Sequence, residues 1–434
     1  MSSSSAGAIL GTDSDKGLKT AASGDPSLPQ ELIDAIVGEL EGDDVVLRNA
    51  SLVNHSFHSS CQKLLFSRIE LKFRPTRHNP YIQFHRLILD SPRIPALVKT
   101  LLIHDFYGGG LESTWFLQDD ILIPRIIELL VNLTSITVHG ARFITRRCQN
   151  LSSATRASLF YTPLPRLTRI SLVNVIFPDF QELVDLLVDR PTLQEVKLLD
   201  VLIHAQTIAG SSPYHGVIDR SRLPQLSSLA VRMSQLEGSP FEMLMNSSFS
   251  THVFGQLEKL QFYLTCTPRS VHSGSLQKLL DMTQDTLEEL VLYTFIERST
   301  ENFVDISCVP RITCVFSTYD FIGGLPDLFR GHYDREQCRM GDVTLRVVLL
   351  DSQALNRCPA ETWESLDDLM VRVKNRVNFV VVTEPESVGR PRNKQLDKQK
   401  VMEGLRRTNL TGILDVEVIG GDLRTELERG YITL

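Results

Sequence analysis

Residues 133–138 read LTSITV, and this short pattern decides the fold because it recurs along the chain. It is written L-x-x-[ILV]-x-[LVF], where x is any residue, and it is matched six times in succession, at Leu133, Ile136, Val138; Leu167, Ile170, Leu172; Leu193, Val196, Leu198; Leu226, Leu229, Val231; Leu257, Leu260, Phe262; and Leu287, Leu290, Leu292. A looser match at Val98, Leu101 and Ile103 precedes them, and the pair Ile69 and Leu71 indicates a first strand. Apolar residues at alternate positions are typical of a strand with one buried face, so a series of strands is predicted.

The final apolar residues of these segments, from Leu71 to Leu292, are spaced between 26 and 35 residues apart. Helix-like stretches lie between them, such as DDILIPRIIELL (119–130), FPDFQELVDLLVD (177–189) and SLQKLLDMTQDT (275–286). One strand and one helix in each period of about thirty residues predicts an α/β solenoid, because such a unit buries its apolar face only against its neighbours. Weaker strand markers continue to the C-terminus at Val315, Val347, Val380 and Val416.

A different spacing marks residues 28–66, LPQELIDAIVGELEGDDVVLRNASLVNHSFHSSCQKLLF. Pro29 suits a first helical turn, Gly42 a helix end, and Asp43 or Asp44 the cap of a second helix. A unit of about 40 residues is too small to bury all its apolar side chains, so some should be left for a partner or the next domain to cover. The apolar residues at helical spacing are Leu32, Ile33, Ile36, Val37 and Leu40 in the first helix, Leu47 in the second, and Val53, Phe57, Cys61 and Leu64 in the third.

Composition narrows the class of protein. The 434 residues exceed one ordinary domain, and the net charge of -7, from 45 basic and 52 acidic residues, lacks the basic excess of a dedicated nucleic-acid binder. The seven cysteines have no regular spacing, which indicates a reducing compartment. No stretch resembles a signal peptide or a membrane span, so a cytoplasmic or nuclear protein is expected.

Residues 28–37, LPQELIDAIV, and 50–66, ASLVNHSFHSSCQKLLF, together resemble the F-box motif, in particular the F-box-like sequences of mushroom-forming fungi. The family usually carries tryptophan where this chain has Phe57 and often cysteine where it has Asn54, which implies weaker rather than absent docking. By resemblance, the motif binds the Skp-family adaptor of an SCF-type cullin–RING ubiquitin ligase. The residues expected to contact the adaptor are Leu28, Pro29, Leu32, Ile36, Leu40, Leu47, Leu52, Val53 and Phe57.

The array of strands and helices resembles leucine-rich repeats, although the asparagine that normally follows each strand is mostly missing, which implies an irregular array. By resemblance, the repeats capture the target protein. In a strand the positions between the core residues point away from the core. The positions expected to contact a target are therefore Thr137, Ser171, Lys197, Ala230, Gln261 and Val291.

The expected organisation has four parts. A tail at 1–25, rich in Ser, Gly, Ala and Asp, should be disordered, and an F-box-like domain fills 26–66. A leucine-rich-repeat-like domain fills 67–320, and a weaker continuation of the repeats fills 321–434, with a charged loop near 384–400. Residues 204–222, rich in Ser, Gly, His and Pro, are a further expected loop.

Alternative interpretations remain open. The helical motif could be only a cap on the repeats, which would make the chain a ligase-independent interaction scaffold. An enzyme is not expected, because no nucleotide-binding, hydrolase or zinc-protease signature occurs. His55, His58 and Cys61 lack a fourth ligand for a closed zinc site, so a solvated helix face is expected, with no metal or cofactor.

Overall fold

The computed structural model describes residues 28–72, 79–104, 122–140, 149–150, 157–159, 162–177, 179–188, 190–203, 220–232, 240–264, 271–294, 304–306, 308–317, 341–349, 359–371, 376–383, 394–410, 412 and 414–420. The expected tail at 1–25 lies outside these residues. The chain divides after Phe66 into two compact units, which we call the N-terminal unit and the sheet unit.

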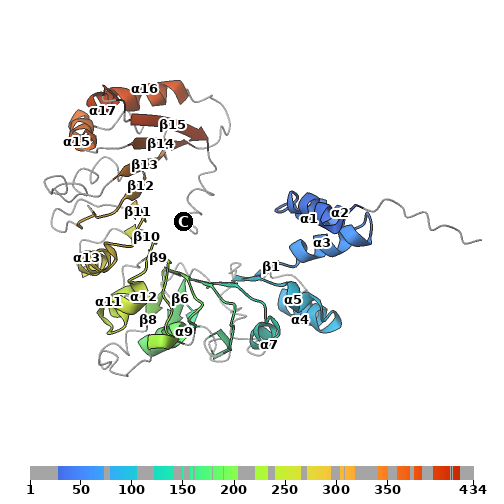
Figure 1. The fold of residues 1–434 in the computed structure, drawn as a ribbon. Coiled ribbons are helices and arrows are strands. Elements are labelled where there is room, and N and C mark those ends of the chain that lie inside the picture. The colour runs from blue at the N-terminus through green and yellow to red at the C-terminus, as the bar shows by residue number, and fades with distance from the viewer. Residues whose placement is uncertain are drawn as a thin grey trace, which may run out of the picture. The chain divides into compact units, whose positions relative to one another are not determined.

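The described part of the N-terminal unit, residues 28–66, contains three helices: α1 (Gln30–Gly38), α2 (Asp44–Ala50) and α3 (His55–Leu65) (Figure 1). Their shared core is small and consists of Ile33, Val37, Leu47 and Cys61. At the edge of this core the buried Ser60 hydroxyl of α3 donates to the Asp34 carboxylate of α1 at 2.5 Å. This hydrogen bond, with a second from Gln30, lowers the pKa of Asp34.

Local capping sets where α2 and α3 begin. The Asp43 carboxylate accepts hydrogen bonds from the amides of Val45 and Val46, at 3.1 and 3.0 Å, and so caps α2. The Asn54 side chain accepts one from the amide of Phe57 at 2.9 Å and caps α3. The turn between α1 and α2 passes through Gly42 at a φ of 97°, which side chains disfavour.

Within the described residues, the sheet unit contains one sheet of 12 strands. The strands follow one another in chain order and every neighbouring pair is parallel, which confirms a mixed α/β protein with a large parallel sheet. The strands are β1 (Arg68–Lys72), β2 (Thr100–His104), β3 (Ser135–His139), β5 (Arg169–Val173), β7 (Glu195–Leu199), β9 (Ser228–Arg232), β10 (Lys259–Leu264), β11 (Glu289–Thr294), β12 (Arg311–Ser317), β13 (Asp342–Leu349), β14 (Val377–Thr383) and β15 (Leu414–Gly420).

Helices connect many of these strands, and in Figure 1 α7, α9, α11, α12 and α13 lie along one side of the row of strands. Phe241 of α11 packs edge-on against Phe262 of β10, and Trp363 of α15 contacts Phe379 of β14. One face of the sheet is thus covered by helices. The helices are α4 (Pro80–Asp90), α5 (Ile94–Leu97), α7 (Leu122–Leu129), α9 (Phe180–Leu187), α11 (Pro240–Asn246), α12 (Ser250–Phe254), α13 (Val271–Thr283), α15 (Ala360–Met370), α16 (Lys394–Gly404), α17 (Arg406–Leu410) and the short 3₁₀ turn Arg220–Arg222.

The core beneath the helices is built from rows of register partners. One row crosses all the main strands, and each of its side chains is at most 5% exposed. Because every strand adds one apolar side chain to the row, neighbouring strands bury each other's cores. The row consists of Leu71, Ile103, Val138, Leu172, Leu198, Val231, Phe262, Leu292, Cys314, Leu345, Phe379 and Val416.

Beyond β3, β5 and β7 the chain continues into a second, three-stranded sheet made of β4 (Gln149–Asn150), β6 (Val175–Phe177) and β8 (Leu202–Ile203). The turns into β6 and β8 pass through Asn174 and Asp200, both with positive φ, at 54° and 53°. Asparagine and aspartate tolerate this backbone better than other residues with a side chain. The amides of Gly140, Asn174 and Asp200 donate to Val173, Leu199 and Arg232, so the ladder of hydrogen bonds extends into these turns.

Several details differ from the sequence expectation. Val315 and Val380 each lie one residue beyond the buried row, which passes through Cys314 and Phe379. The marker Val347 lies two residues beyond Leu345, the member of the row in β13. The segment from Lys394 to Lys400, expected as part of a charged loop, instead begins helix α16, where Asp397 and Val401 are buried. The rest of that loop, 384–393, and residues 204–219 lie outside the described residues.

Candidate docking surfaces

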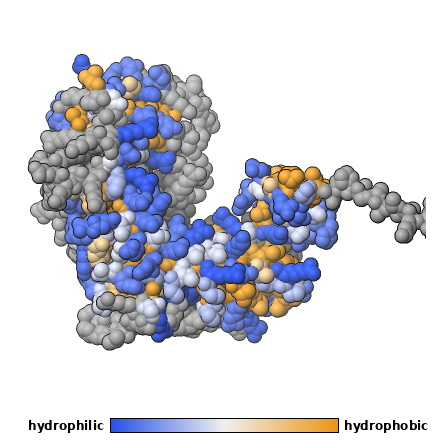
Figure 2. Space-filling view, in the orientation of Figure 1, coloured by the Kyte–Doolittle hydropathy of each residue, from blue (hydrophilic) through white to orange (hydrophobic). Residues whose placement is uncertain are grey.

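The N-terminal unit leaves several large apolar side chains exposed, and Figure 2 shows apolar surface on it. Leu32 and Ile36 lie on the exposed side of α1, beside the buried Ile33 and Val37, and Leu28 precedes the helix. Leu52 and Val53 lie in the turn between α2 and α3. Their exposed fractions are 50% for Leu28, 52% for Leu32, 46% for Ile36, 82% for Leu52 and 67% for Val53. We call these five residues the apolar face.

The other residues predicted to contact an adaptor lie differently. Pro29 is exposed, whereas Leu40 and Phe57 are half-buried and pack against the core of the unit. Leu47 is 2% exposed and belongs to that core, so a partner at the surface would not touch its side chain. In a unit this small, some positions of the motif are needed to hold the helices together.

Two further exposed apolar residues of the N-terminal unit were not predicted from the sequence. Val45 and Val46 lie in the first turn of α2, and both side chains are exposed. The cap at Asp43 could have indicated their exposure. Because the cap fixes where α2 begins, Leu47 is on the side of the helix that faces the core, and Val45 and Val46 lie on other sides.

The second candidate surface is the face of the sheet opposite the helices, which we call the open face. The predicted target-binding positions are register partners there and form one continuous row from β3 to β11. All except Ala230 are half-buried, while Ala230 is buried and offers a partner little contact. The row consists of Thr137, Ser171, Lys197, Ala230, Gln261 and Val291.

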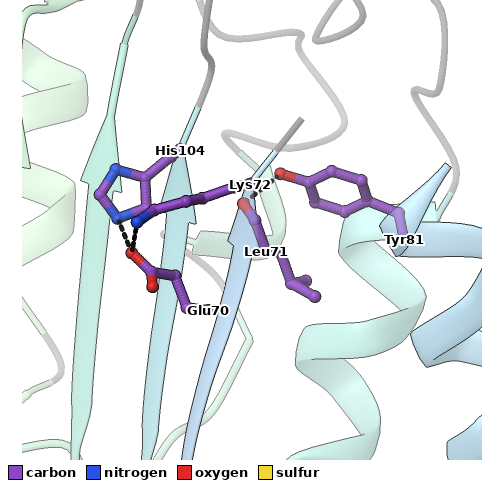
Figure 3. Close-up of polar contacts among 5 residues, drawn as sticks. All are labelled: Glu70, Leu71, Lys72, Tyr81 and His104. Carbon is purple, nitrogen blue, oxygen red and sulfur yellow. Dashed lines mark hydrogen bonds and ion pairs between the residues drawn. The ribbon is translucent and has the colours of Figure 1, made fainter. Parts of the chain in front are cut away.

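The next row on the open face begins with Lys72, His104 and His139. Glu70, which lies in the same row as Thr137, completes an ionisable cluster with them, and Figure 3 shows Glu70, Lys72 and His104. One Glu70 carboxylate oxygen lies 2.9 Å from the Lys72 ammonium nitrogen and 3.0 Å from His104 Nε2. The His104 and His139 rings stack with their centroids 4.4 Å apart. Burial, with a smaller effect of His104, lowers the pKa of His139 to about 4. Burial also lowers the pKa of His104, against the opposing pull of Glu70.

Further along this row most side chains are apolar, with Arg232, Arg346 and Glu417 among them. Val173, Leu199 and Tyr263 are buried together, and Tyr263 stacks on Tyr293 with centroids 4.2 Å apart. Val315, Val380 and Val382 form a second buried group. The alternating pattern predicted only one buried face for each strand, so neither group was predicted. The apolar run FVVV in β14, residues 379–382, could have indicated the second group.

Side chains that could carry chemistry are dispersed over the described residues, among which no group of three or more His, Cys, Asp or Glu is placed to hold a metal ion. His55 and His58 are exposed on α3. Cys61 and Cys314 are buried, and burial raises the pKa of both thiols. No helix in the described ranges is long and apolar enough to cross a membrane.

The chain matches no known protein-family model, and a search of curated proteins finds no relative.

Proposed function

We propose that the N-terminal unit is an F-box that docks a Skp-family adaptor, which makes the chain a substrate receptor of an SCF-type cullin–RING ubiquitin ligase. The observation that carries the proposal is the apolar face, where five large side chains are between 46% and 82% exposed. Exposed apolar side chains gathered on one small unit are typical of a protein-binding surface. Their positions are among those that the resemblance to the F-box assigns to adaptor contact.

The sheet unit, in this proposal, is an irregular leucine-rich-repeat solenoid that holds the target protein. Its strands follow one another in chain order and share one buried row, as expected when each repeat packs only against its neighbours. The open face offers the half-buried row around Thr137, Ser171 and Gln261 for target contact. The ligase's rate advantage would come from holding the target near the ubiquitin-loaded enzyme, so the chain's role is positional.

The test is capture of a purified Skp-family adaptor by the full-length chain, in wild type and in the double variant Leu32→Asp with Leu52→Asp. Both residues are exposed, so the substitutions should leave the fold intact while placing charge in a dry interface. We expect the wild type to bind and the double variant to bind at least about tenfold more weakly.

The matched control is Leu410→Asp, which changes a leucine that is 76% exposed at the end of α17 in the sheet unit. This variant should capture the adaptor like the wild type. Failure of the wild type to bind would instead favour the ligase-independent scaffold, in which the N-terminal unit is only a cap. Binding by the double variant at wild-type strength would show that the apolar face is not the docking surface.

A second experiment separates a receptor from a scaffold. Proteins that co-purify with the chain are compared with and without a proteasome inhibitor, in the wild type and in the Leu32→Asp, Leu52→Asp variant. A target of a ligase should accumulate with the inhibitor for the wild type. In the variant, the abundance of the target should no longer depend on the inhibitor. The abundance of partners of a scaffold would be the same with and without the inhibitor, in the wild type and in the variant.

A further inference from the structure

The first three strands place three potentially cationic side chains side by side. Lys72 of β1 is the register partner of His104 in β2, and His104 is the partner of His139 in β3. Like charges directly opposite each other destabilise a sheet. The row is therefore stable when Lys72 is its only cation. Protonation of the histidines destabilises it, because like charges then lie side by side.

Among the described residues, the charged groups that act on the two histidines include a single carboxylate. Those groups are Arg68, Glu70 and Lys72, all from β1. Glu70 already contacts both Lys72 and His104 through a single oxygen. On the far side, β5 places Val173 beside His139, which offers no counter-charge.

We infer that this cluster makes the β1–β3 end of the sheet a proton-sensitive element, which opens locally in mildly acidic solution while the rest of the sheet stays closed. β1 lies at an edge and pairs only with β2 among the described strands, so opening there costs less than at an interior strand. Because β1 begins at Arg68, two residues after the N-terminal unit ends at Phe66, opening would lengthen the tether between the two units.

The direction of the effect follows from proton linkage. In the closed sheet His139 takes up a proton only near pH 4, whereas in an opened strand it would do so near its ordinary value of 6.5. Between these values the open state binds more protons, so lowering the pH favours opening. The stabilisation is complete above about pH 6.5 and is lost as the pH falls towards about 4.

The same row supplies an internal control. Tyr263 and Tyr293 occupy the equivalent positions in β10 and β11 and stack with their rings 5° from parallel. Their ordinary pKa values are near 10, so this pair does not change charge in mild acid. The His104–His139 stack should respond to pH where the tyrosine stack does not.

The experiment is hydrogen exchange on the full-length protein at about pH 5 and about pH 7.5, with protection corrected for intrinsic exchange rates. Protection of β1–β3 relative to β10–β11 should fall by about tenfold to thirtyfold at the lower pH, as expected from linkage for one histidine. In the double variant His104→Phe with His139→Phe, which keeps two stacking rings but cannot be protonated, the fall should be less than about threefold.

Two results would overturn the inference: equal relative protection at both pH values in the wild type, or an undiminished fall in the double variant. Should the phenylalanine variant fail to fold, His139→Gln offers a smaller non-titrating side chain, and it should reduce the fall. The wild-type comparison between the two ends of the sheet needs no variant. Adaptor capture plays no part in this test, so its outcome is independent of the proposed function.

Discussion

Single residues decide how tightly neighbouring strands approach each other at the end of the sheet. Gly140 follows β3, and its amide donates to the carbonyl of Val173 at 2.8 Å. A Cβ atom at this position would overlap the carbonyl oxygen of Asn174, which is backbone and cannot move aside without shifting the strand. Glycine is required here by the close approach of two chain segments separated by one repeat period.

Gly140→Ala should therefore destabilise the protein by about 2 kcal/mol or more, because relief of the overlap must disturb the ladder between β3 and β5. The measurement is the midpoint of urea unfolding. The matched control is Gly274→Ala in α13, where a Cβ meets no atom and alanine favours the helix. A loss of stability in the control as large as in Gly140→Ala would contradict this explanation.

At the scale of the element, capping residues determine the helix boundaries of the N-terminal unit. The sequence left Asp43 and Asp44 as alternative caps of α2, and the structure selects Asp43, whose carboxylate accepts from two amides. Asp44 is the first residue of the helix itself. The choice of the capping aspartate depends on the direction in which the chain leaves the turn at Gly42. That turn follows α1, which is held by its packing against the core of the unit.

Asp43→Ala should weaken α2 by about 1 kcal/mol, since two amides lose their acceptor. Hydrogen exchange in the full-length chain should become faster across Asp44–Ala50. Asp44→Ala tests the alternative, because it removes a carboxylate from the first turn and leaves the cap in place. The assignment would be wrong if Asp44→Ala had the larger effect.

At the scale of the whole molecule, the two units differ in how they are stabilised. The N-terminal unit has a core of four buried apolar residues, whereas the sheet unit has a buried row that runs through every main strand. A core that small contributes only a few kcal/mol, near the limit for independent folding. All the residues of that row belong to the sheet unit.

A chain that starts at Ser67 should therefore keep its far-ultraviolet circular dichroism and unfold within a few degrees of the full-length protein. It should also lose capture of the Skp-family adaptor. Residues 28–66 alone should show weak helicity, which rises when a partner covers the apolar face. Unfolding or aggregation of the longer fragment would show that the sheet unit depends on the N-terminal unit.

Much of this architecture was predictable because its signals are local. Ile136 and Val138 alternate with polar residues within β3, so the buried face of this strand can be recognised without knowing its neighbours. In β14 (VNFVVVT) the alternation of apolar residues does not indicate the core face, because the strand is buried on both faces. The strand marker predicted from the sequence was therefore Val380 instead of Phe379. Only the register with β13 shows which residue belongs to the row.

By itself, the sequence determined that strands and helices alternate and that residues 28–66 form helices, since propensity, capping and alternation act between near neighbours. Only the tertiary structure decided that Leu47 lies inside while Leu52 lies outside, and that His104 meets His139 across two strands. These outcomes depend on contacts between residues far apart in the chain, and no local pattern encodes the register that brings them together.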